Sequence, residues 1–486
     1  MPKFQMFRMK KLSLACGIAL SGLAGNAAAV NVDLFISGAT AQDVNLAKAV
    51  SDLCLNNANK IRINTTGAGV GSTYMCDADP ATSGLAAGDT LVISKQTTGG
   101  SANGVKPVND GLATLVGGAP NSMLRPQTSQ VASGCTGPTV GAAPWTTVYT
   151  CTSNAGAAAP HAGLSDVEPS LLALSGDIGN LAPVGTVAVQ FAPAISTELY
   201  KKLQAQQGLI VGDFTEAQAP TLHPADVRGI LNATIADWSQ IVPGITPNPV
   251  AAGITTEIKL CRRGTTSGTQ KTFETRLFNA GTNGTNPGCN GSLAPGNGAL
   301  NPVLGNNDDA TPLNDGVQFS TGTALNQGGY RGRTDAYTVV VNSGASDVQQ
   351  CLITADGQGE MAIGLLSTEV TPPANWKFPK MGGIFPNRQS LVDGGWDQLW
   401  SQATFQRRIA PAGAAPAYLA GQTTVMNKLQ TLIGDPANIL ALALNGVAAL
   451  PSNGFTWTGL AANPVMRGER RSTGGVVNNC QEALTQ

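Results

Sequence analysis

Short apolar runs alternate with stretches of helical periodicity along much of the chain. The strand-like runs lie at 32–36, 90–94, 184–193, 256–263 and 360–367. Helical spacing marks the stretches 40–53, 196–208, 223–241, 267–277 and 397–408. Strands are expected from short apolar runs, and helices from apolar residues three or four positions apart. Their alternation predicts an α/β protein.

Two of the predicted helices begin with polar signals just after a strand. Thr40 and Asp43 have the spacing of a capping box, as do Ser267 and Gln270. A helix N-terminus presents unpaired N–H groups and the positive end of its dipole, so it favours an anion. Each signal alone has a plain structural interpretation, because helices commonly begin at Ser or Thr.

The first 29 residues have the pattern of a secretory signal peptide. A basic start precedes an apolar stretch at 12–23 and a small-residue cleavage site at 27–29. We expect an exported protein, periplasmic or secreted, that does not insert in a membrane, since no later run has the roughly 20 apolar residues of a bilayer span.

The remaining chain is mildly acidic and long enough for two or three domains. Removing residues 1–29 lowers the formal net charge from −1 to −5. Charged residues make up 12% of the sequence, about half the usual share. A mildly acidic chain with scattered Lys and Arg is not typical of a nucleic-acid binder.

Eight cysteines follow the signal segment, at Cys54, Cys76, Cys135, Cys151, Cys261, Cys289, Cys351 and Cys480. An even number in an exported chain indicates disulfides, although 105 pairings are possible. The neighbouring cysteines predict the pairs Cys54–Cys76, Cys135–Cys151 and Cys261–Cys289, which leaves Cys351–Cys480. A metal site is disfavoured because the sequence has no CxxC motif and only two histidines.

Two other stretches show little hydrophobic periodicity. Residues 106–160 are rich in small residues and suggest an insertion held by a disulfide, and residues 279–335 suggest a long loop region. The basic cluster at 467–471 is expected to be a solvated surface.

Four ordered motifs combine small residues, hydroxyls and charge. They are the Gly38-Ala-Thr40 turn, the Gly100-Ser101 loop, Ser165-Asp166 followed by Pro169, and Arg263-x-x-x-Ser-Gly-Thr269 at a helix start. Arginine offers a planar fork that matches an oxyanion. In this order the motifs resemble those of the periplasmic phosphate-binding proteins of ABC-type phosphate uptake. The resemblance extends over most of the chain after residue 29, interrupted by insertions near 70–90, 106–160 and 280–335.

The resemblance implies a two-lobe periplasmic-binding-protein-like (type II) α/β fold with two interlobe crossovers. Lobe I would comprise 30–190 plus 350–486, and lobe II would comprise 191–349. The implied phosphate ligands are Thr40, Ala41, Ser101, Asp166, Arg263, Ser267, Gly268 and Thr269. The chain departs from the family pattern at Ala41, where a larger residue is common. It departs again at Thr265, where an Asp usually pairs with the arginine.

Asp166 decides which anion such a site would accept. An ionised carboxylate only accepts hydrogen bonds, so it requires an oxyanion that still carries a proton. Protonated phosphate meets that condition near neutral pH, and sulfate does not. Taken alone, Asp166 is equally explained as a turn or capping residue.

The expected function is therefore capture of inorganic phosphate without catalysis or a cofactor, with delivery to a transporter permease as a further step. Two alternatives stay open: a secreted structural or adhesive protein that kept the fold, and a phosphate-ester hydrolase using the same anion site. The sequence has neither a Gly-x-Ser-x-Gly elbow nor a P-loop.

Overall fold

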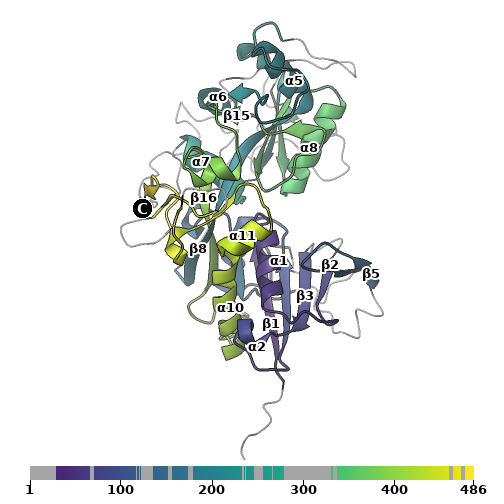
Figure 1. Cartoon of the computed structure of the whole chain (residues 1–486), viewed down its shortest axis with the longest axis vertical. Helices are drawn as coiled ribbons and strands as arrows, with labels where there is room; N and C mark the ends of the chain where they lie inside the picture. Colours follow the sequence, from purple (N-terminus) through teal and green to yellow (C-terminus); the bar gives the residue numbers. More distant parts are fainter. Residues whose placement is uncertain are drawn as a thin grey trace, which may run out of the picture.

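The computed structural model describes residues 29–485 apart from 66–70, 117, 120, 122–134, 152–155, 173–178, 232–234, 236, 246–255, 265, 279–329, 332–336, 459–463 and 472–476. It shows a mixed α/β protein organised around one large mixed sheet (Figure 1). The prediction of the α/β class is confirmed. The predicted loop region at 279–335 and most of the signal segment lie outside the described residues.

The large sheet runs in the order β11-β12-β10-β13-β8-β16-β7-β1-β4-β3-β2-β6-β5, with β14 and β17 also paired to β8. Its strands are β1 (Asn31–Gly38), β2 (Ile61–Thr65), β3 (Gly71–Asp77), β4 (Thr90–Gln96), β5 (Cys135–Val140), β6 (Thr147–Cys151), β7 (Ala162–Ser165), β8 (Leu181–Ser196), β10 (Ile258–Arg263), β11 (Tyr330–Arg331), β12 (Tyr337–Asn342), β13 (Ala362–Ser367), β14 (Trp376–Lys377), β16 (Trp400–Arg408) and β17 (Val447–Ala449). Two small sheets pair β9 (Thr221–Leu222) with β15 (Lys380–Met381) and β18 (Gly468–Glu469) with β19 (Leu484–Thr485).

The α-helices are α1 (Asp43–Asp52), α2 (Pro80–Ser83), α3 (Lys106–Asp110), α5 (Thr197–Gln206), α6 (Pro224–Leu231), α7 (Gly268–Phe278), α8 (Ala345–Gly357), α9 (Arg388–Val392), α10 (Ala420–Ile433) and α11 (Pro436–Ala441). Short 3₁₀ turns are η1 (Ser101–Gly104), η2 (Pro169–Leu172), η3 (Trp238–Gln240) and η5 (Pro451–Asn453). Figure 1 shows α1 and α10 beside the strands near β1, and α5, α6 and α8 at the opposite end of the molecule.

Strand β8 connects the two ends of the large sheet. Its first part, from Leu181 to Gln190, pairs with β16. Its second part, from Phe191 to Ile195, pairs with β13. The partner changes between Gln190 and Phe191, although the strand itself continues. A single strand therefore carries the chain from one set of strands to the other.

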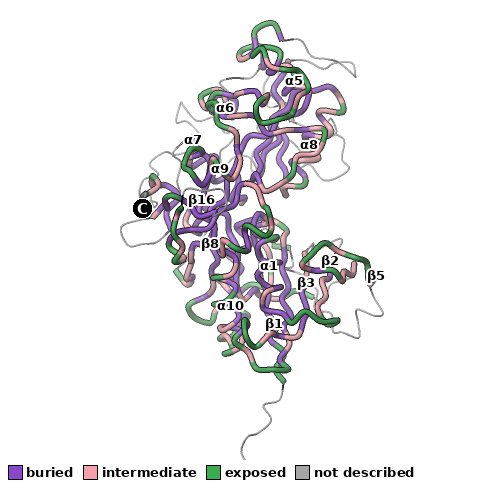
Figure 2. Tube along the Cα trace, viewed as in Figure 1, coloured by how far each residue is buried: buried purple, intermediate pink, exposed green. Residues whose placement is uncertain are grey.

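The core follows these central strands. Most residues of β8 and β16 are buried, as the buried trace in Figure 2 shows. The main hydrophobic cluster includes residues from both ends of the sheet, such as Leu34 on β1, Phe191 on β8 and Leu260 on β10. Burial on both faces explains why these strands have no strict alternation of polar and apolar residues.

Several predicted elements need correction. The stretch 397–408 was expected to be helical, but residues 400–408 form the central strand β16. Several polar side chains of this strand, among them Ser401 and Gln406, are fully buried and hydrogen-bonded, so they do not mark an exposed face. The first helix begins at Asp43, and no side-chain bond caps it, so the predicted capping box at Thr40 is absent.

Three disulfides join described cysteines. Cys54–Cys76 and Cys135–Cys151 confirm two predicted pairs. Cys261 pairs with Cys351, so the predicted pairs Cys261–Cys289 and Cys351–Cys480 are wrong. Disulfides persist in oxidising compartments, so these bonds support the prediction of export.

The third disulfide follows from sheet pairing. β10, which carries Cys261, lies beside β13, and α8, which carries Cys351, packs on both strands. Cys289 lies outside the described residues, and Cys480 is disulfide-bonded.

Across the described residues, no helix is both long and apolar enough to cross a membrane.

Candidate functional site

Three of the four predicted motifs lie at the carboxyl ends of parallel strands. β1 pairs in parallel with both β4 and β7, so the turns that follow these strands emerge at one edge of the sheet. Thr40 and Ala41 follow β1, Ser101 follows β4, and Asp166 follows β7. In open α/β sheets this edge is where ligands bind. Sheet pairing alone therefore brings these three turns to one place.

Ser101 and Asp166 are in direct contact and buried. The Ser101 hydroxyl donates to Asp166 Oδ2 at 3.2 Å, and the Asp166 amide donates to Ser101 Oγ at 3.1 Å. Gly100 precedes Ser101 with φ 69° and ψ −156°, a conformation essentially restricted to glycine. The backbone conformation of Gly100 therefore orients Ser101 toward the Asp166 carboxylate.

The fourth motif comes from the other end of the sheet, where β10 leads into α7. Its loop packs on the Ser101 turn, because the Ala102 amide donates to the Thr266 carbonyl at 3.1 Å. A methyl group placed on Gly100 would lie 3.2 Å from Nη2 of Arg263. The guanidinium of Arg263 is therefore adjacent to the turn after β4.

Gly268, the first residue of α7, makes the closest approach between the two ends. A methyl group at this position would lie 2.4 Å from Ser101 Oγ and 2.7 Å from Asp166 Cβ. Contacts this short require movement of the neighbouring atoms. The structure thus brings the N-terminus of α7 against Ser101 and Asp166, which are 102 to 167 positions away in sequence.

Two buried atoms of the cluster have no hydrogen-bond partner among the described residues. They are Oδ1 of Asp166 and Nε of Arg263. Both side chains are 5% exposed. An unpaired buried polar atom costs free energy, so such atoms call for a ligand or another partner. One is an acceptor and the other a donor.

Burial dominates the electrostatics of these two groups. It raises the pKa of Asp166 to about 6, although Arg263, the Ser101 hydroxyl and Lys95 all favour the ionised form. Burial also lowers the pKa of Arg263, which Asp166 and Asp347 partly offset. The proximity of Asp166 and Arg263 therefore compensates only part of the desolvation cost.

Asp347 was not predicted from the sequence. Arg263 Nη2 donates to the Ser343 carbonyl at 2.8 Å. The Asp347 carboxylate accepts from the Ser343 hydroxyl and from the Gly344 amide, and so holds the loop before α8. Asp347, from another element, also favours the charged form of Arg263 electrostatically. Asp347 has capping-box spacing after Gly344, which is the signal that could have drawn attention to it.

Thr40, Ala41 and Thr269 are less closely tied to the cluster. Thr40 is half-buried, while Ala41 and Thr269 are buried. The turn holding Thr40 and Ala41 is fixed near Asp166, because Gln42 Nε2 donates to the Ser165 carbonyl at 3.1 Å. Among the described residues, no side-chain hydrogen bond links these three positions to Arg263 or Asp166.

Side chains of β16 hydrogen-bond to the turn that carries Asp166 and to α7. Ser401 Oγ donates to the Asp166 carbonyl at 2.6 Å, and Thr272 Oγ1 of α7 donates to Ser401 Oγ at 3.2 Å. Thr404 Oγ1 donates to the Val167 carbonyl at 3.3 Å. Ser401 therefore bridges the Asp166 turn and α7. Ser401 was missed in the sequence analysis because the stretch 397–408 was expected to be helical.

Two further charged groups lie near the cluster. Lys95 Nζ donates to the Gly38 carbonyl at 2.9 Å and so fixes the turn after β1. Glu369 follows β13, and burial together with repulsion from Asp166 and Asp43 raises its pKa to about 7. Its Oε1 accepts from the Ser367 hydroxyl at 2.6 Å.

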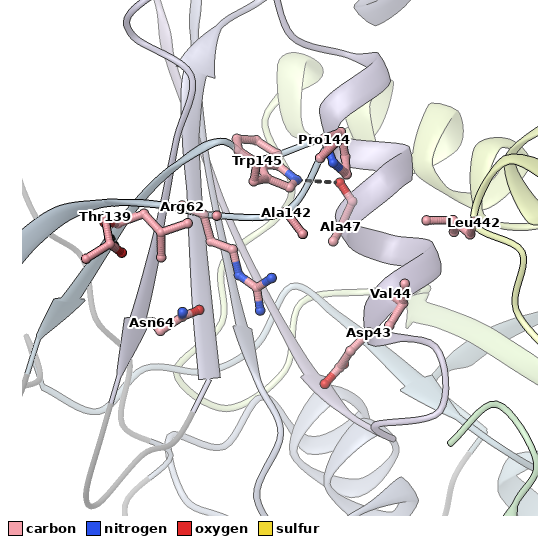
Figure 3. A pocket seen from close by; sticks show the side chains of 13 residues that line it. Asp43, Val44, Ala47, Arg62, Asn64, Thr139, Ala142, Pro144, Trp145 and Leu442 are labelled. Atoms are coloured by element: carbon pink, nitrogen blue, oxygen red, sulfur yellow. Dashed lines mark hydrogen bonds between the residues drawn. The ribbon is translucent and has the colours of Figure 1, made fainter. Parts of the chain in front are cut away.

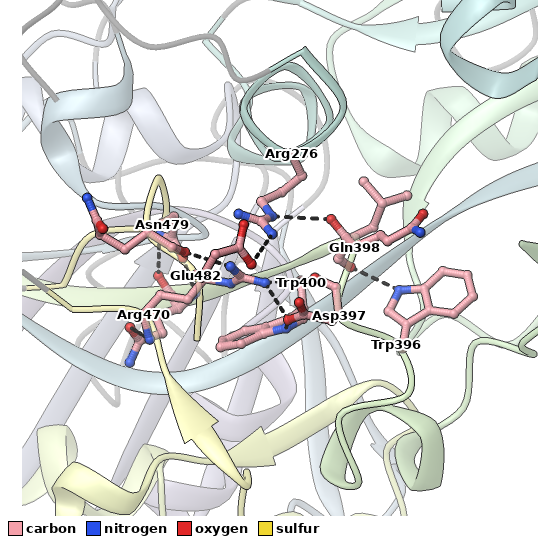
Figure 4. A network of polar contacts seen from close by, with 11 residues as sticks. Arg276, Trp396, Asp397, Gln398, Trp400, Arg470, Asn479 and Glu482 are labelled. Atoms are coloured by element: carbon pink, nitrogen blue, oxygen red, sulfur yellow. Dashed lines mark hydrogen bonds and ion pairs between the residues drawn. The ribbon is translucent and has the colours of Figure 1, made fainter. Parts of the chain in front are cut away.

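A buried polar network anchors the C-terminal segment beside the Asp166 turn (Figure 4). The Glu168 carboxylate accepts from the Asn479 backbone and side chain, and burial raises its pKa to about 7. Arg470 lies 4.3 Å from the Trp400 ring and donates to Asp397. Arg470 is fully buried, so the prediction that cluster 467–471 is a solvated surface is wrong for this residue.

The two histidines are the side chains that could serve as a catalytic base for Ser267. His161 Nδ1 accepts from the Phe35 amide at 2.9 Å and Nε2 contacts Gln422, so this side chain is built into the sheet. His223 lies exposed before α6. Neither histidine contacts Ser267 in the described structure. The described residues contain no group of three or more His, Cys, Asp or Glu side chains that could hold a metal ion.

Comparison with known families and with curated proteins finds no match for this chain.

Proposed function

We propose that this protein binds inorganic phosphate at the Ser101–Asp166–Arg263–Gly268 cluster and does not transform it. The observation that carries the proposal is the pair of buried unpaired atoms, Asp166 Oδ1 and Arg263 Nε. A monohydrogen or dihydrogen phosphate can satisfy both, because its P–O–H group donates while its other oxygens accept. The N-terminus of α7 adds backbone N–H donors and a favourable dipole.

We also propose that the chain forms two lobes, with boundaries at 30–190 plus 350–486 for lobe I and 191–349 for lobe II. The change of partner along β8 at Gln190 and Phe191 supports a crossover there. Ser101 and Asp166 would then belong to lobe I, and Arg263 and Gly268 to lobe II. Ligand binding would close the lobes around the anion by hinge motion.

Selectivity in this proposal depends on Asp166. Sulfate carries no proton at neutral pH, so its oxygens cannot donate to the ionised carboxylate. Bound sulfate would leave two negative groups in contact unless Asp166 takes up a proton. Because the pKa of Asp166 is about 6, that protonation costs about 1.4 kcal/mol at pH 7. We therefore expect a preference for phosphate of about tenfold at pH 7, which increases as the pH rises.

The test is calorimetric titration of phosphate-stripped protein with phosphate and with sulfate. We expect saturable binding of one phosphate per chain, and sulfate binding that is about tenfold weaker at pH 7. Arg263→Gln should weaken phosphate binding strongly, because it removes the guanidinium. Asp393→Asn provides the control, since Asp393 is exposed and lies outside the cluster. Absence of heat and of a thermal shift with phosphate would refute the proposal.

Delivery of the captured anion to a membrane transporter is a further part of the proposal. It rests on the family resemblance of the four motifs. Phosphate-limited cells lacking the protein should lose high-affinity phosphate uptake. Normal uptake in such cells would exclude the transport role while leaving the binding itself unaffected.

A further inference from the structure

A second cavity lies away from the phosphate cluster. It has a volume of about 380 Å³, is open to solvent, and is lined by residues of α1, β2 and the hairpin of β5 and β6 (Figure 3). This volume is within the range of small-molecule sites, about 300–1,000 Å³. The proposed function does not use this cavity.

One wall of the cavity is apolar and firmly held. Trp145 Nε1 donates to the Ala47 carbonyl at 2.8 Å, which joins the hairpin to α1. The Trp145 ring also packs against Tyr74, with ring centroids 4.9 Å apart. Pro144 and Val148 continue this wall. The surface is therefore preformed, which lowers the entropy cost of binding an apolar group.

Arg62 supplies a positive group to the cavity. Its side chain reaches from β2 toward the face of α1 that carries Asp43, as Figure 3 shows. Nε and Nη2 both donate to Ser72 Oγ, at 3.3 and 3.0 Å, and the guanidinium lies 5.7 Å from the Tyr74 ring centroid. No carboxylate in the described part of the chain forms an ion pair with Arg62. The guanidinium is therefore hydrogen-bonded to a neutral group and attracted by Asp43 without forming an ion pair with it, so it can still bind an anion.

Asp43 supplies the opposite charge. It lines the cavity at the start of α1, and its Oδ1 lies 3.0 Å from Lys95 Nζ. No hydrogen bond to the second carboxylate oxygen is present among the described residues. Asp43 can therefore accept a hydrogen bond from a ligand while Lys95 holds it in place.

We propose that this cavity binds a free α-amino acid with an apolar side chain. The α-carboxylate would pair with Arg62, and the α-ammonium group would donate to Asp43. The side chain would lie against Trp145, Pro144 and Val148. A purely apolar ligand would leave both charges unsatisfied, and a simple anion would meet Asp43 without a donor.

The probes are L-leucine and three close analogues. Leucinamide lacks the carboxylate, 4-methylpentanoate lacks the ammonium group, and 2-hydroxy-4-methylpentanoate replaces that group by a hydroxyl. Calorimetry on the full secreted chain should show one leucine site, with leucinamide and 4-methylpentanoate each at least tenfold weaker. L-Valine, L-isoleucine and L-phenylalanine are titrated in parallel. Absence of binding by all four amino acids would overturn the proposal. Equal or tighter binding of 4-methylpentanoate or the hydroxy acid would also overturn the amino-acid assignment.

Substitutions in the cavity then test whether leucine binds there. Arg62→Gln should reduce leucine affinity at least tenfold and leave phosphate affinity unchanged, since Arg62 lies outside the phosphate cluster. Arg228→Gln is the matched control, because Arg228 is exposed on α6. Ala142→Trp fills the cavity from an exposed loop position and should abolish leucine binding without altering a charge. If Arg62→Gln fails to fold, the Ala142→Trp variant tests the proposal instead. Leucine binding that survives a folded Arg62→Gln or Ala142→Trp variant would show that the site lies elsewhere.

Discussion

Replacing Asp166 by Asn should stabilise the ligand-free protein at neutral pH. The folded carboxyl has a pKa of about 6, against an ordinary value of 3.8, mainly because it is buried. Folding therefore takes up a proton between about pH 4 and pH 6. The stability that this provides is fully present below about pH 4 and is lost as the pH rises through 6.

The difference between these pKa values corresponds to about 3 kcal/mol at pH 7 to 8. This is an upper limit on the gain, because an Asn side chain replaces one carboxylate oxygen by an amide donor. Asn can still accept the Ser101 hydroxyl bond, so the substitution is structurally conservative. Relative to wild type, the variant should gain stability between pH 4 and 7.

The assay is urea unfolding of both proteins in phosphate-free buffer at several pH values. Phosphate must be removed, since a bound ligand adds its own stabilisation. Glu168 and Glu369, whose pKa values are raised to about 7, also make stability pH-dependent. They are present in both proteins, so the difference between the two curves reports Asp166 together with its repulsion of Glu369. A constant difference between pH 4 and 8 would refute the electrostatic reasoning.

Three further substitutions test other parts of the structure. Gly268→Ala should lower phosphate affinity about tenfold or more in calorimetry, because the new methyl group would lie 2.4 Å from Ser101 Oγ; unchanged affinity would show that this contact is not required. Ser401→Ala should lower the free energy of unfolding by about 1–3 kcal/mol in urea, since the Asp166 carbonyl loses a buried donor; a change within error would contradict the bridging role. Cys351→Ser should cost about 2–4 kcal/mol and remove the peptide cross-link to Cys261 in non-reducing mass spectrometry; a cross-link from Cys261 to another cysteine in the wild type would contradict the observed pairing.

The sequence contained enough information to predict the local features of the site. The turns after β1, β4 and β10 are marked by glycine and hydroxyl residues, and the turn after β7 by Ser165, Asp166 and Pro169. Such signals are local, because a chain must turn where a strand ends. Parallel pairing, which the sequence analysis did not predict, then brings the turns after β1, β4 and β7 together.

The supporting residues could not be predicted in the same way. Ser401 and Arg470 are polar residues in buried positions, and their patterns resemble exposed surface. Only the tertiary structure supplies the carbonyl, carboxylate and aromatic partners that make their burial favourable. The Cys261–Cys351 bond has the same origin, because it spans 90 positions and depends on α8 packing on β10.

The most direct test of the phosphate site is a crystal structure of the protein grown with phosphate. The account predicts one anion with oxygen atoms about 3 Å from both Asp166 Oδ1 and Arg263 Nε. The amide groups at the start of α7 should contact the same anion. A phosphate that binds away from this cluster, or a cluster with no anion at saturating phosphate, would contradict the account.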